Sequence, residues 1–278
     1  MIALQRRKDG IPAKFQGAGL AAEMAKLLDA YFVNNRTVPY STQKSLEIWG
    51  KSKTNLKKES FNKCAYCESP TATVAHGDVE HFRPKSIYWW LAYSYDNYTY
   101  ACQICNQTHK SDNFLPSPAV LKPPKIVPAA RPSDAKLAEL ATQLCPDPAT
   151  STQASLNALW RREKAHLPHP YVDDPEALLA WEADDINREM VLVARPGKPK
   201  STQAVLACES ILGLNRLELK QWRYPQYEHI HVLAEVLQSG PNATISAIVK
   251  KSLAEAARDD RPYAGMTRYF LRQWGVLA

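Results

Sequence analysis

Two short cysteine motifs, Cys64-Ala-Tyr-Cys67 and Cys102-Gln-Ile-Cys105, frame the stretch that decides the fold, with Gly77-Asp-Val-Glu-His-Phe-Arg-Pro-Lys-Ser86 between them. Each CxxC can present two thiolates from one tight turn, and two such turns brought together make a closed tetrahedral site that suits zinc. The alternative is four buried thiols or a redox pair, which two pairs around one compact segment disfavour. We therefore predict a structural zinc site with no open position for substrate, formed by Cys64, Cys67, Cys102 and Cys105.

The segment between the cysteine pairs sets an acid directly beside a histidine, at Glu80-His81, and then adds Arg83 and Lys85. A neutral imidazole can take a proton from water near pH 7, and a carboxylate oxygen suits a hard divalent cation. Arg and Lys side chains can hold phosphates. These are the components of a phosphodiester hydrolase. A single histidine is more often structural than catalytic, so the surrounding motifs must decide between the two interpretations.

The composition is that of a globular protein, with 278 residues of which 45% are hydrophobic and 23% are charged. These values exclude a disordered or fibrous chain. No stretch approaches the roughly 20 apolar residues that a membrane helix needs, and the first residues lack the apolar segment of a secretory signal. We therefore expect a cytoplasmic protein with no membrane association.

The net charge of +7 suggests a polyanionic partner. Residues 1–125 contain 17 basic and 10 acidic side chains, whereas residues 126–278 contain 18 of each. The whole surplus therefore lies in the N-terminal part, which also contains both cysteine pairs.

Patterns along the chain predict mostly helices. Apolar spacing favours a helix over 18–33 and shorter ones over 42–51 and 54–63. Repeated proline at 116–134 predicts an extended connector, and Ser133 is suited to be the N-cap of the helix that follows.

The C-terminal part adds a hairpin and further helices. Alternating runs within 177–196 predict a small β-hairpin. The helices expected after it cover 201–214, 216–240, with Pro225 at its start or at a kink, 243–259 and 263–275. Cys145 and Cys208 have no CxxC partner and are interpreted as packing residues.

The residues after the histidine make the pattern specific. Asp96-Asn97 precedes the run Cys102-Gln-Ile-Cys-Asn-Gln-Thr-His-Lys110. An acid–His pair followed by Pro, a central Asn and CxxCN with a nearby Lys resembles the HNH (ββα-metal) endonuclease family. EHFRPKS, W-x-A-Y-x-x-D-N and C-N-x-T-x-K resemble more closely the PtuB-like HNH nuclease subunits of Septu and retron-type anti-phage systems. The resemblance covers residues 55–225 in patches and is strongest in 64–116.

This resemblance implies an α+β, mostly α fold, in which a ββα-metal HNH core with the four-cysteine zinc site is embedded in a helical protein. A small β-hairpin and C-terminal helices complete the chain. The expected domains are 1–125, with the nuclease core at about 60–118, and 126–278, which is mainly helical and either supports the core or docks a partner.

The resemblance also implies roles for individual residues. His81 would be the general base that activates the attacking water, Glu80 and Asn106 would hold a catalytic Mg²⁺ or Mn²⁺, and Asn97 would orient the loop that carries the histidine. The expected nucleic-acid contacts are Arg83, Lys85 and Lys110.

Two metal ligands stay open at this point. Asp78 is an alternative to Glu80, because many family members have Asp before the base. His109 can complete the metal site, touch phosphate or cap the helix. On a regular strand Asp78 and Glu80 share a face and His81 points away, so the roles of Glu80 and His81 together require a bend at the strand end.

The implied function is hydrolysis of phosphodiester bonds in DNA by the nuclease effector of an anti-phage system. The implied partners are an ABC/SMC-like ATPase subunit (PtuA-like) and, in retron systems, a reverse transcriptase with its nucleic acid. The alternative is a non-catalytic, zinc-stabilised nucleic-acid-binding or adaptor module, for which the basic charge and the cysteines would suffice. Such a module does not need His81, Asn97 and Asn106 together, so we favour the nuclease.

Overall fold

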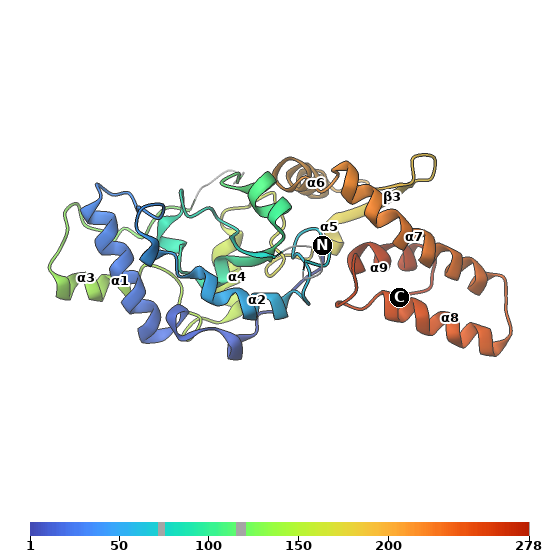
Figure 1. The fold of residues 1–278 in the computed structure, drawn as a ribbon, viewed down its shortest axis with the longest axis horizontal. Helices are drawn as coiled ribbons and strands as arrows, with labels where there is room; N and C mark the ends of the chain where they lie inside the picture. The colour runs from blue at the N-terminus through green and yellow to red at the C-terminus, as the bar shows by residue number, and fades with distance from the viewer. Residues whose placement is uncertain (72–75, 115–120, 278) are drawn as a thin grey trace.

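The computed structural model describes residues 1–71, 76–114 and 121–277, and shows an α+β chain that is about half helical. Its described strands form two small antiparallel sheets of two strands each. Figure 1 shows an elongated molecule with α1 (Gly17–Val33) and α3 (Asp134–Ala141) at one end and α8 (Ala243–Ala256) at the other. The N-terminus and the first sheet lie between these ends.

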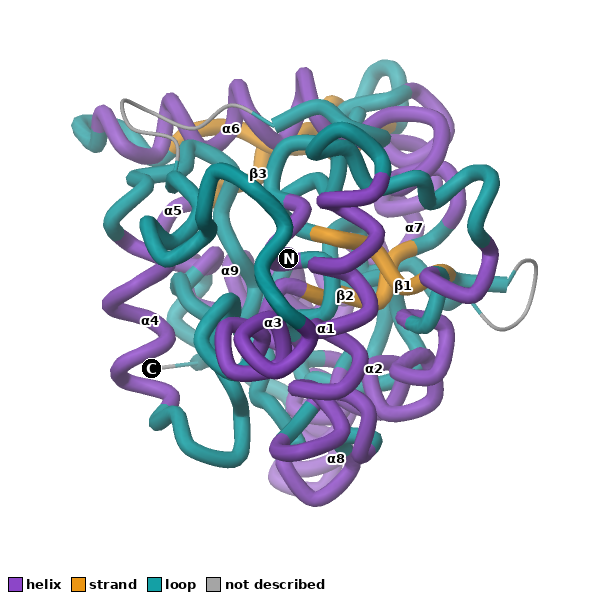
Figure 2. The backbone as a smooth tube through the Cα atoms, turned by 90° about the vertical axis from the view of Figure 1, so that its left-hand side faces the viewer, coloured by secondary structure: helices purple, strands orange, loops and turns teal. Residues whose placement is uncertain are grey.

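The first sheet pairs β1 (Asp78–His81) with β2 (Tyr98–Ala101). In its register Asp78 lies opposite Ala101, and His81 lies opposite Tyr98. The chain leaves β2 directly into Cys102 and then forms η7 (Ile104–Lys110), a short π-helix. Figure 2 shows this sheet surrounded by helices. The consequence is that both cysteine motifs and the Glu80-His81 pair converge on one strand–strand–helix unit.

Aromatic side chains fill the core beside this sheet. Phe15 packs edge-to-face on Tyr98, and Phe82 packs in the same way on Phe114. The tyrosines of the segment from β1 through β2 are at most 2% exposed, namely Tyr88, Tyr93, Tyr95, Tyr98 and Tyr100. Each buried ring removes a large apolar area from water, so these residues stabilise the core.

The second sheet is the hairpin of β3 (Leu179–Asp184) and β4 (Glu189–Ala194), as the alternating sequence predicts. Two helices, α6 (Pro199–Leu212) and α7 (Leu217–Gln238), pack against this hairpin, and α6 also packs on η7. The C-terminal helices α8 and α9 (Ala264–Gln273) pack on α7. The C-terminal helical region therefore contacts the strand–strand–helix unit through α6.

Several local expectations are confirmed and others differ. The predicted helix at 18–33 is α1, and the Ser133 side chain accepts a hydrogen bond from Lys136 N at the start of α3. The helix expected over 42–51 is instead two 3-10 turns, Lys44–Leu46 and Trp49–Ser52, before α2 (Lys53–Glu59). Pro225 lies inside α7, which continues through it.

Some short helical segments fall outside the sequence expectations. They are α4 (Gln153–Arg161), α5 (Pro175–Leu178) and the turns before α1, Lys8–Gly10 and Ala13–Phe15. Thr152 caps α4 by accepting a hydrogen bond from Ser155 N. Residues 116–120 of the predicted connector lie outside the described residues. The division into 1–125 and 126–278 stays a prediction.

No helix in the described ranges is both long enough and apolar enough to cross a membrane.

Candidate functional site

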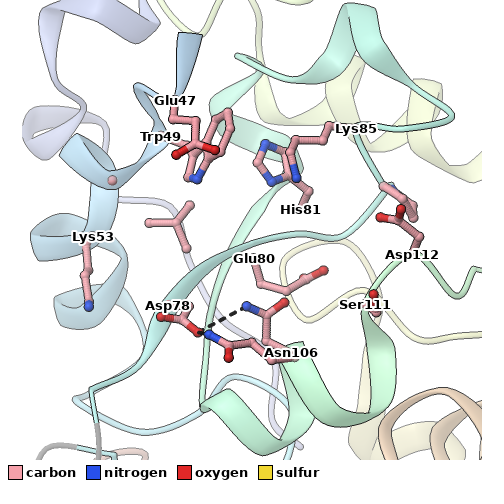
Figure 3. A pocket seen from close by; sticks show the side chains of 14 residues that line it. Glu47, Trp49, Lys53, Asp78, Glu80, His81, Lys85, Asn106, Ser111 and Asp112 are labelled. Carbon is pink, nitrogen blue, oxygen red and sulfur yellow. Dashed lines mark hydrogen bonds between the residues drawn. The ribbon is translucent and has the colours of Figure 1, made fainter. Parts of the chain in front are cut away.

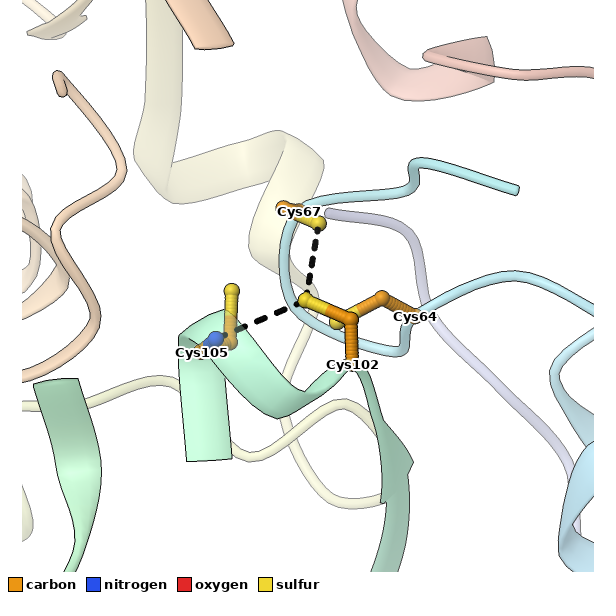
Figure 4. A group of neighbouring side chains, drawn as sticks. All are labelled: Cys64, Cys67, Cys102 and Cys105. Atoms are coloured by element: carbon orange, nitrogen blue, oxygen red, sulfur yellow. Dashed lines mark hydrogen bonds between the residues drawn. The ribbon is translucent and has the colours of Figure 1, made fainter. Parts of the chain in front are cut away.

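The four predicted cysteines form one cluster. Their sulfur atoms all lie within 4.8 Å of one another, and the Sγ atoms of Cys67 and Cys102 are 3.9 Å apart. Cys64 and Cys67 come from the turn after α2, whereas Cys102 and Cys105 come from the end of β2 and from η7 (Figure 4). The turn is fixed to the sheet because Ala65 N donates to Tyr100 O at 2.8 Å.

The cluster fits a tetrahedral metal ion. Zinc–sulfur bonds of about 2.3 Å place ligand sulfurs about 3.8 Å apart. Hydrogen bonds from Cys102 and Cys105 lower the pKa of Cys67, whereas burial raises the pKa of Cys64 and the hydrogen bond with Cys102 raises that of Cys105. A bound cation would favour the thiolate form of all four. Two N–H groups donate hydrogen bonds to the sulfurs. Cys105 N donates to Cys102 Sγ at 3.4 Å, and Arg216 Nη1 donates to Cys105 Sγ at 3.8 Å. The four cysteines can therefore hold zinc, and an N–H donor from each side offsets their negative charge.

The same unit also lines an acidic cavity (Figure 3). Its volume is about 540 Å³, and all four residues of β1 line it, together with Asn106 from η7. Besides His81, its ionisable lining comprises four carboxylates and two ammonium groups, from Glu47, Asp78, Glu80, Asp112, Lys53 and Lys85. The excess of carboxylates suits a divalent cation better than it suits a bare phosphate.

His81 lies at the end of β1 in the wall of this cavity and is 8% exposed. Its Nε2 is 3.1 Å from Ala92 O, which can only accept, so the neutral ring carries its proton on Nε2. Nδ1 has no hydrogen-bond partner among the described residues. Burial, and next the charge of Lys85, lower the pKa of His81 to about 3. The ring is therefore neutral at pH 7 and has Nδ1 available as a proton acceptor.

Asn97 lies behind His81 and is fully buried. Its Oδ1 accepts from Arg83 N at 2.9 Å, and its Nδ2 donates to Arg83 O at 3.0 Å. Phe82 N also donates to Asn97 O at 2.8 Å. Asn97 therefore holds the backbone directly after His81 from both sides, which is the geometry that the orienting role requires.

Glu80 is committed to other partners. Its Oε1 lies 2.6 Å from Lys110 Nζ, and its Oε2 accepts from Tyr66 OH at 2.5 Å and Thr99 Oγ1 at 2.9 Å. Only 2% of Glu80 is exposed. Since both oxygens are already satisfied by donors, Glu80 is poorly placed to bind a metal without breaking these bonds.

Asp78 is the more accessible carboxylate. It is half-buried, and its Oδ2 accepts from Asn106 Nδ2 at 3.3 Å and Gln107 Nε2 at 2.8 Å. Figure 3 shows Asp78 and Asn106 directed toward one another in the cavity. The structure thus brings the alternative acid, rather than Glu80, into contact with Asn106.

The three expected nucleic-acid contacts occupy different environments. Lys85 is half-buried in the cavity wall, with Nζ 5.1 Å from the ring centre of Trp49. Arg83 and Lys110 are at most 1% exposed, and Arg83 Nε pairs with Glu163 Oε2 at 2.6 Å. Lys110 also donates to His81 O at 2.9 Å. Buried ion pairs hold both cations inside the protein in this structure, and their contact with nucleic acid stays a prediction.

His109 faces away from the acidic cavity. A Cβ added to Gly213 would lie 2.4 Å from the His109 ring, so the ring packs on the end of α6. Gly213 has a φ of +58° and caps that helix. In this structure His109 contacts the C-terminal helical region, and its expected role in completing the metal site, touching phosphate or capping the helix stays a prediction.

Sequence reasoning missed several cavity residues. Trp49 packs edge-to-face on His81 with ring centres 5.1 Å apart, and Lys53 and Gln107 also line the site. Lys53 belongs to a basic run that resembles an ordinary solvated surface. No local signal marks Trp49, which lies 32 positions before His81 in the chain.

Comparison with known proteins finds a partial match. A segment of 74 residues is 40% identical to the Septu protein PtuB of Bacillus mycoides (strain KBAB4). It covers 22% of this chain and 25% of that protein, so the chain matches about a quarter of the relative's length. No family model matches the chain, and no solved structure matches it.

Proposed function

We propose that this protein is a metal-dependent HNH-type nuclease that hydrolyses phosphodiester bonds of DNA in an anti-phage defence system of the Septu type. The observation that carries the proposal is His81, a buried neutral imidazole with Nδ1 free, in the wall of a cavity that also contains Asp78 and Asn106. A general base beside oxygen ligands for a divalent ion is the arrangement that hydrolysis requires. The order β1, β2, η7 is consistent with a ββα-metal core.

Asp78 and Asn106 would hold the catalytic ion, since one offers a carboxylate and the other an amide oxygen on adjoining elements. Mg²⁺ or Mn²⁺ suits such oxygen ligands and would polarise the scissile phosphate. Glu80 would instead fix the position of η7 through Lys110.

The chain's own residues prepare the remaining chemistry. His81 Nδ1 would accept the proton of the attacking water while Ala92 O holds the ring in place through Nε2. Asn97 keeps the following backbone rigid, so the imidazole stays aligned. Lys85 in the same wall would bind a substrate phosphate.

The partners follow from the match to PtuB and stay within the proposal. We expect an ATPase subunit of the ABC/SMC type (PtuA-like) to act with this chain, and a retron reverse transcriptase with its nucleic acid is the further expected partner. The four-cysteine cluster would be the structural zinc site of the nuclease.

A cleavage assay tests the function directly. Purified protein is incubated with Mg²⁺ or Mn²⁺ and with double-stranded DNA, single-stranded DNA or RNA, with and without the protein encoded by the neighbouring gene. We expect DNA cleavage that His81→Ala lowers by about 10² to 10⁴-fold. His229→Ala, which removes an exposed histidine of α7 outside the cavity, is the control and should cleave normally.

Undiminished cleavage by His81→Ala, with zinc content and melting temperature unchanged, would refute the assignment of the base. Zinc-dependent binding of DNA with no cleavage under any condition would favour the non-catalytic module.

A further inference from the structure

A second cavity of about 560 Å³ lies beside the acidic one, and the two have no lining residue in common. Its wall is built by Phe82 and Arg83 after β1, by Trp160 at the end of α4, by the loop 161–173 and by the start of α6. The elements of both the N-terminal and the C-terminal parts of the chain therefore meet around it.

Three N–H groups of its lining residues lack an acceptor among the described residues: Arg83 Nη1, Trp160 Nε1 and His169 Nε2. These side chains are 1% to 3% exposed. Arg83 Nε donates to Glu163 Oε2, and Arg83 Nη2 donates to Trp160 O at 3.3 Å, so Nη1 is the nitrogen without an acceptor among the described residues. Each of these atoms is enclosed by protein, so they lie behind the cavity wall and add N–H dipoles to it without being exposed to a ligand.

The protonation state of His169 follows from its other nitrogen. Tyr171 N donates to His169 Nδ1 at 3.2 Å, so the proton of the neutral ring is on Nε2, which is then a donor. Burial lowers the pKa of His169, which keeps the ring in this neutral form. All three unpaired groups are thus donors.

The charged residues of this cavity have the opposite balance to those of the acidic one. Cations stand at its rim, namely Arg161, Lys164 and Lys200, and Asp173 is its carboxylate. Asp173 Oδ2 accepts from His169 N at 2.8 Å and is turned toward that backbone. Cations at a rim above unpaired donors suit a phosphate-bearing ligand.

Most of the remaining lining is apolar or aromatic, and His166 and Gln203 are its further polar residues. Phe82 packs on the His169 ring with centres 4.2 Å apart, and Leu167, Val172 and Leu178 complete this side. The volume lies within the range of small-ligand sites, about 300 to 1,000 Å³. An apolar wall below a basic rim accommodates a planar base and its phosphates together.

We infer that this second cavity binds a nucleotide as a small-molecule ligand, with the phosphates at Lys164 and Lys200 and the base against the Phe82 side. This inference does not rest on the proposed nuclease activity, because no residue of the acidic cavity takes part in it.

Isothermal titration calorimetry with ATP, AMP and inorganic phosphate, in buffer without added divalent cations, tests the inference on the full chain. We expect ATP to bind and the double variant Lys164→Glu, Lys200→Glu to bind it at least about tenfold more weakly. Lys250→Glu, an exposed lysine of α8, and Lys53→Glu, in the acidic cavity, should bind ATP as the wild type does.

Absence of ATP and AMP binding at millimolar concentration overturns the inference, and so does equal binding by the double variant and the wild type. Inorganic phosphate that binds as tightly as ATP also overturns it, because the apolar wall then plays no part. Binding of a single-stranded oligonucleotide at Lys164 and Lys200, without binding of ATP, would also overturn the inference. The ligand of the cavity would then be the end of a nucleic-acid strand and not a small molecule. None of these readouts depends on cleavage, so failure here and failure of the nuclease proposal are distinguishable.

Discussion

Lys110 Nζ lies 2.6 Å from Glu80 Oε1, and both side chains are at most 2% exposed. This ion pair joins η7 to β1 at the centre of the strand–strand–helix unit. Breaking one partner of such a pair leaves an uncompensated buried charge, whereas replacing both leaves none.

Lys110→Met should therefore destabilise the protein by about 3 to 5 kcal/mol. The double variant Glu80→Gln, Lys110→Met should recover a large part of that loss, because no isolated charge is left. Urea denaturation of the single variants, the double variant and the wild type measures the difference. A loss below about 1 kcal/mol for Lys110→Met would show that the pair is not buried as described.

Asp78→Asn should weaken metal-dependent cleavage and raise the Mn²⁺ concentration needed for half-maximal rate, because a neutral amide is a poorer ligand than a carboxylate. Its unfolding free energy should stay near that of the wild type, since Asp78 is only half-buried. Asp9→Asn, at an exposed position, is the control. If Asp78→Asn leaves the Mn²⁺ dependence unchanged, the ligand is another group.

Cys64→Ser should lose zinc and destabilise the fold, because a structural zinc site contributes its binding free energy to folding. Cys208→Ser replaces an equally buried thiol outside the cluster and should keep the metal. Metal content by mass spectrometry and melting temperature report both effects. Equal zinc in the two variants would contradict a four-cysteine site.

Asn97→Ala removes two buried hydrogen bonds to the backbone of Arg83. The expected loss is about 2 to 4 kcal/mol, from two bonds of about 1 kcal/mol each and the partners left unpaired. Asn97→Asp keeps the acceptor for Arg83 N but loses the donor, so cleavage by this variant should lie between that of Asn97→Ala and that of the wild type. Cleavage that is unchanged in Asn97→Ala would exclude an orienting role.

His169 should make the stability depend on pH. Its pKa is lowered in the folded protein, so the unfolded chain binds the proton first as the pH falls. The contribution of neutral His169 to the free energy of unfolding is complete above the ordinary histidine pKa of about 6.5, and it is lost as the pH falls toward the pKa of His169 in the folded protein. Between pH 6 and 5 the wild type should lose up to about 1.4 kcal/mol more than His169→Asn. Chemical denaturation at both pH values measures this, and parallel losses would contradict it.

The sequence predicts best what short-range spacing determines. Each CxxC turn brings two sulfurs together, and the alternation within 177–196 predicts the hairpin. Both patterns can be recognised because each is complete within a few residues. The meeting of Glu80, His81 and Asn106 at one cavity also follows from the motif, since β1 and η7 are adjacent.

What could not be predicted depends on partners far along the chain. Arg83 is buried because Glu163 lies 80 residues later, and His109 is turned away because α6 presents Gly213 to it. A basic residue beside a catalytic motif indicates a phosphate contact until such a partner is known. For the same reason, nothing in the local pattern distinguishes Asp78, which faces the cavity, from Glu80, which is held by Lys110.

The residues from Glu80 to Lys85 act as a partition between two chambers. Glu80, His81, Pro84 and Lys85 line the acidic cavity, whereas Phe82 and Arg83 line the basic one. A ligand that shifts this wall from either side must therefore change the free energy of binding on the other, and by thermodynamic reciprocity the two effects are equal. Occupancy of one cavity would then change the affinity of the other for its ligand.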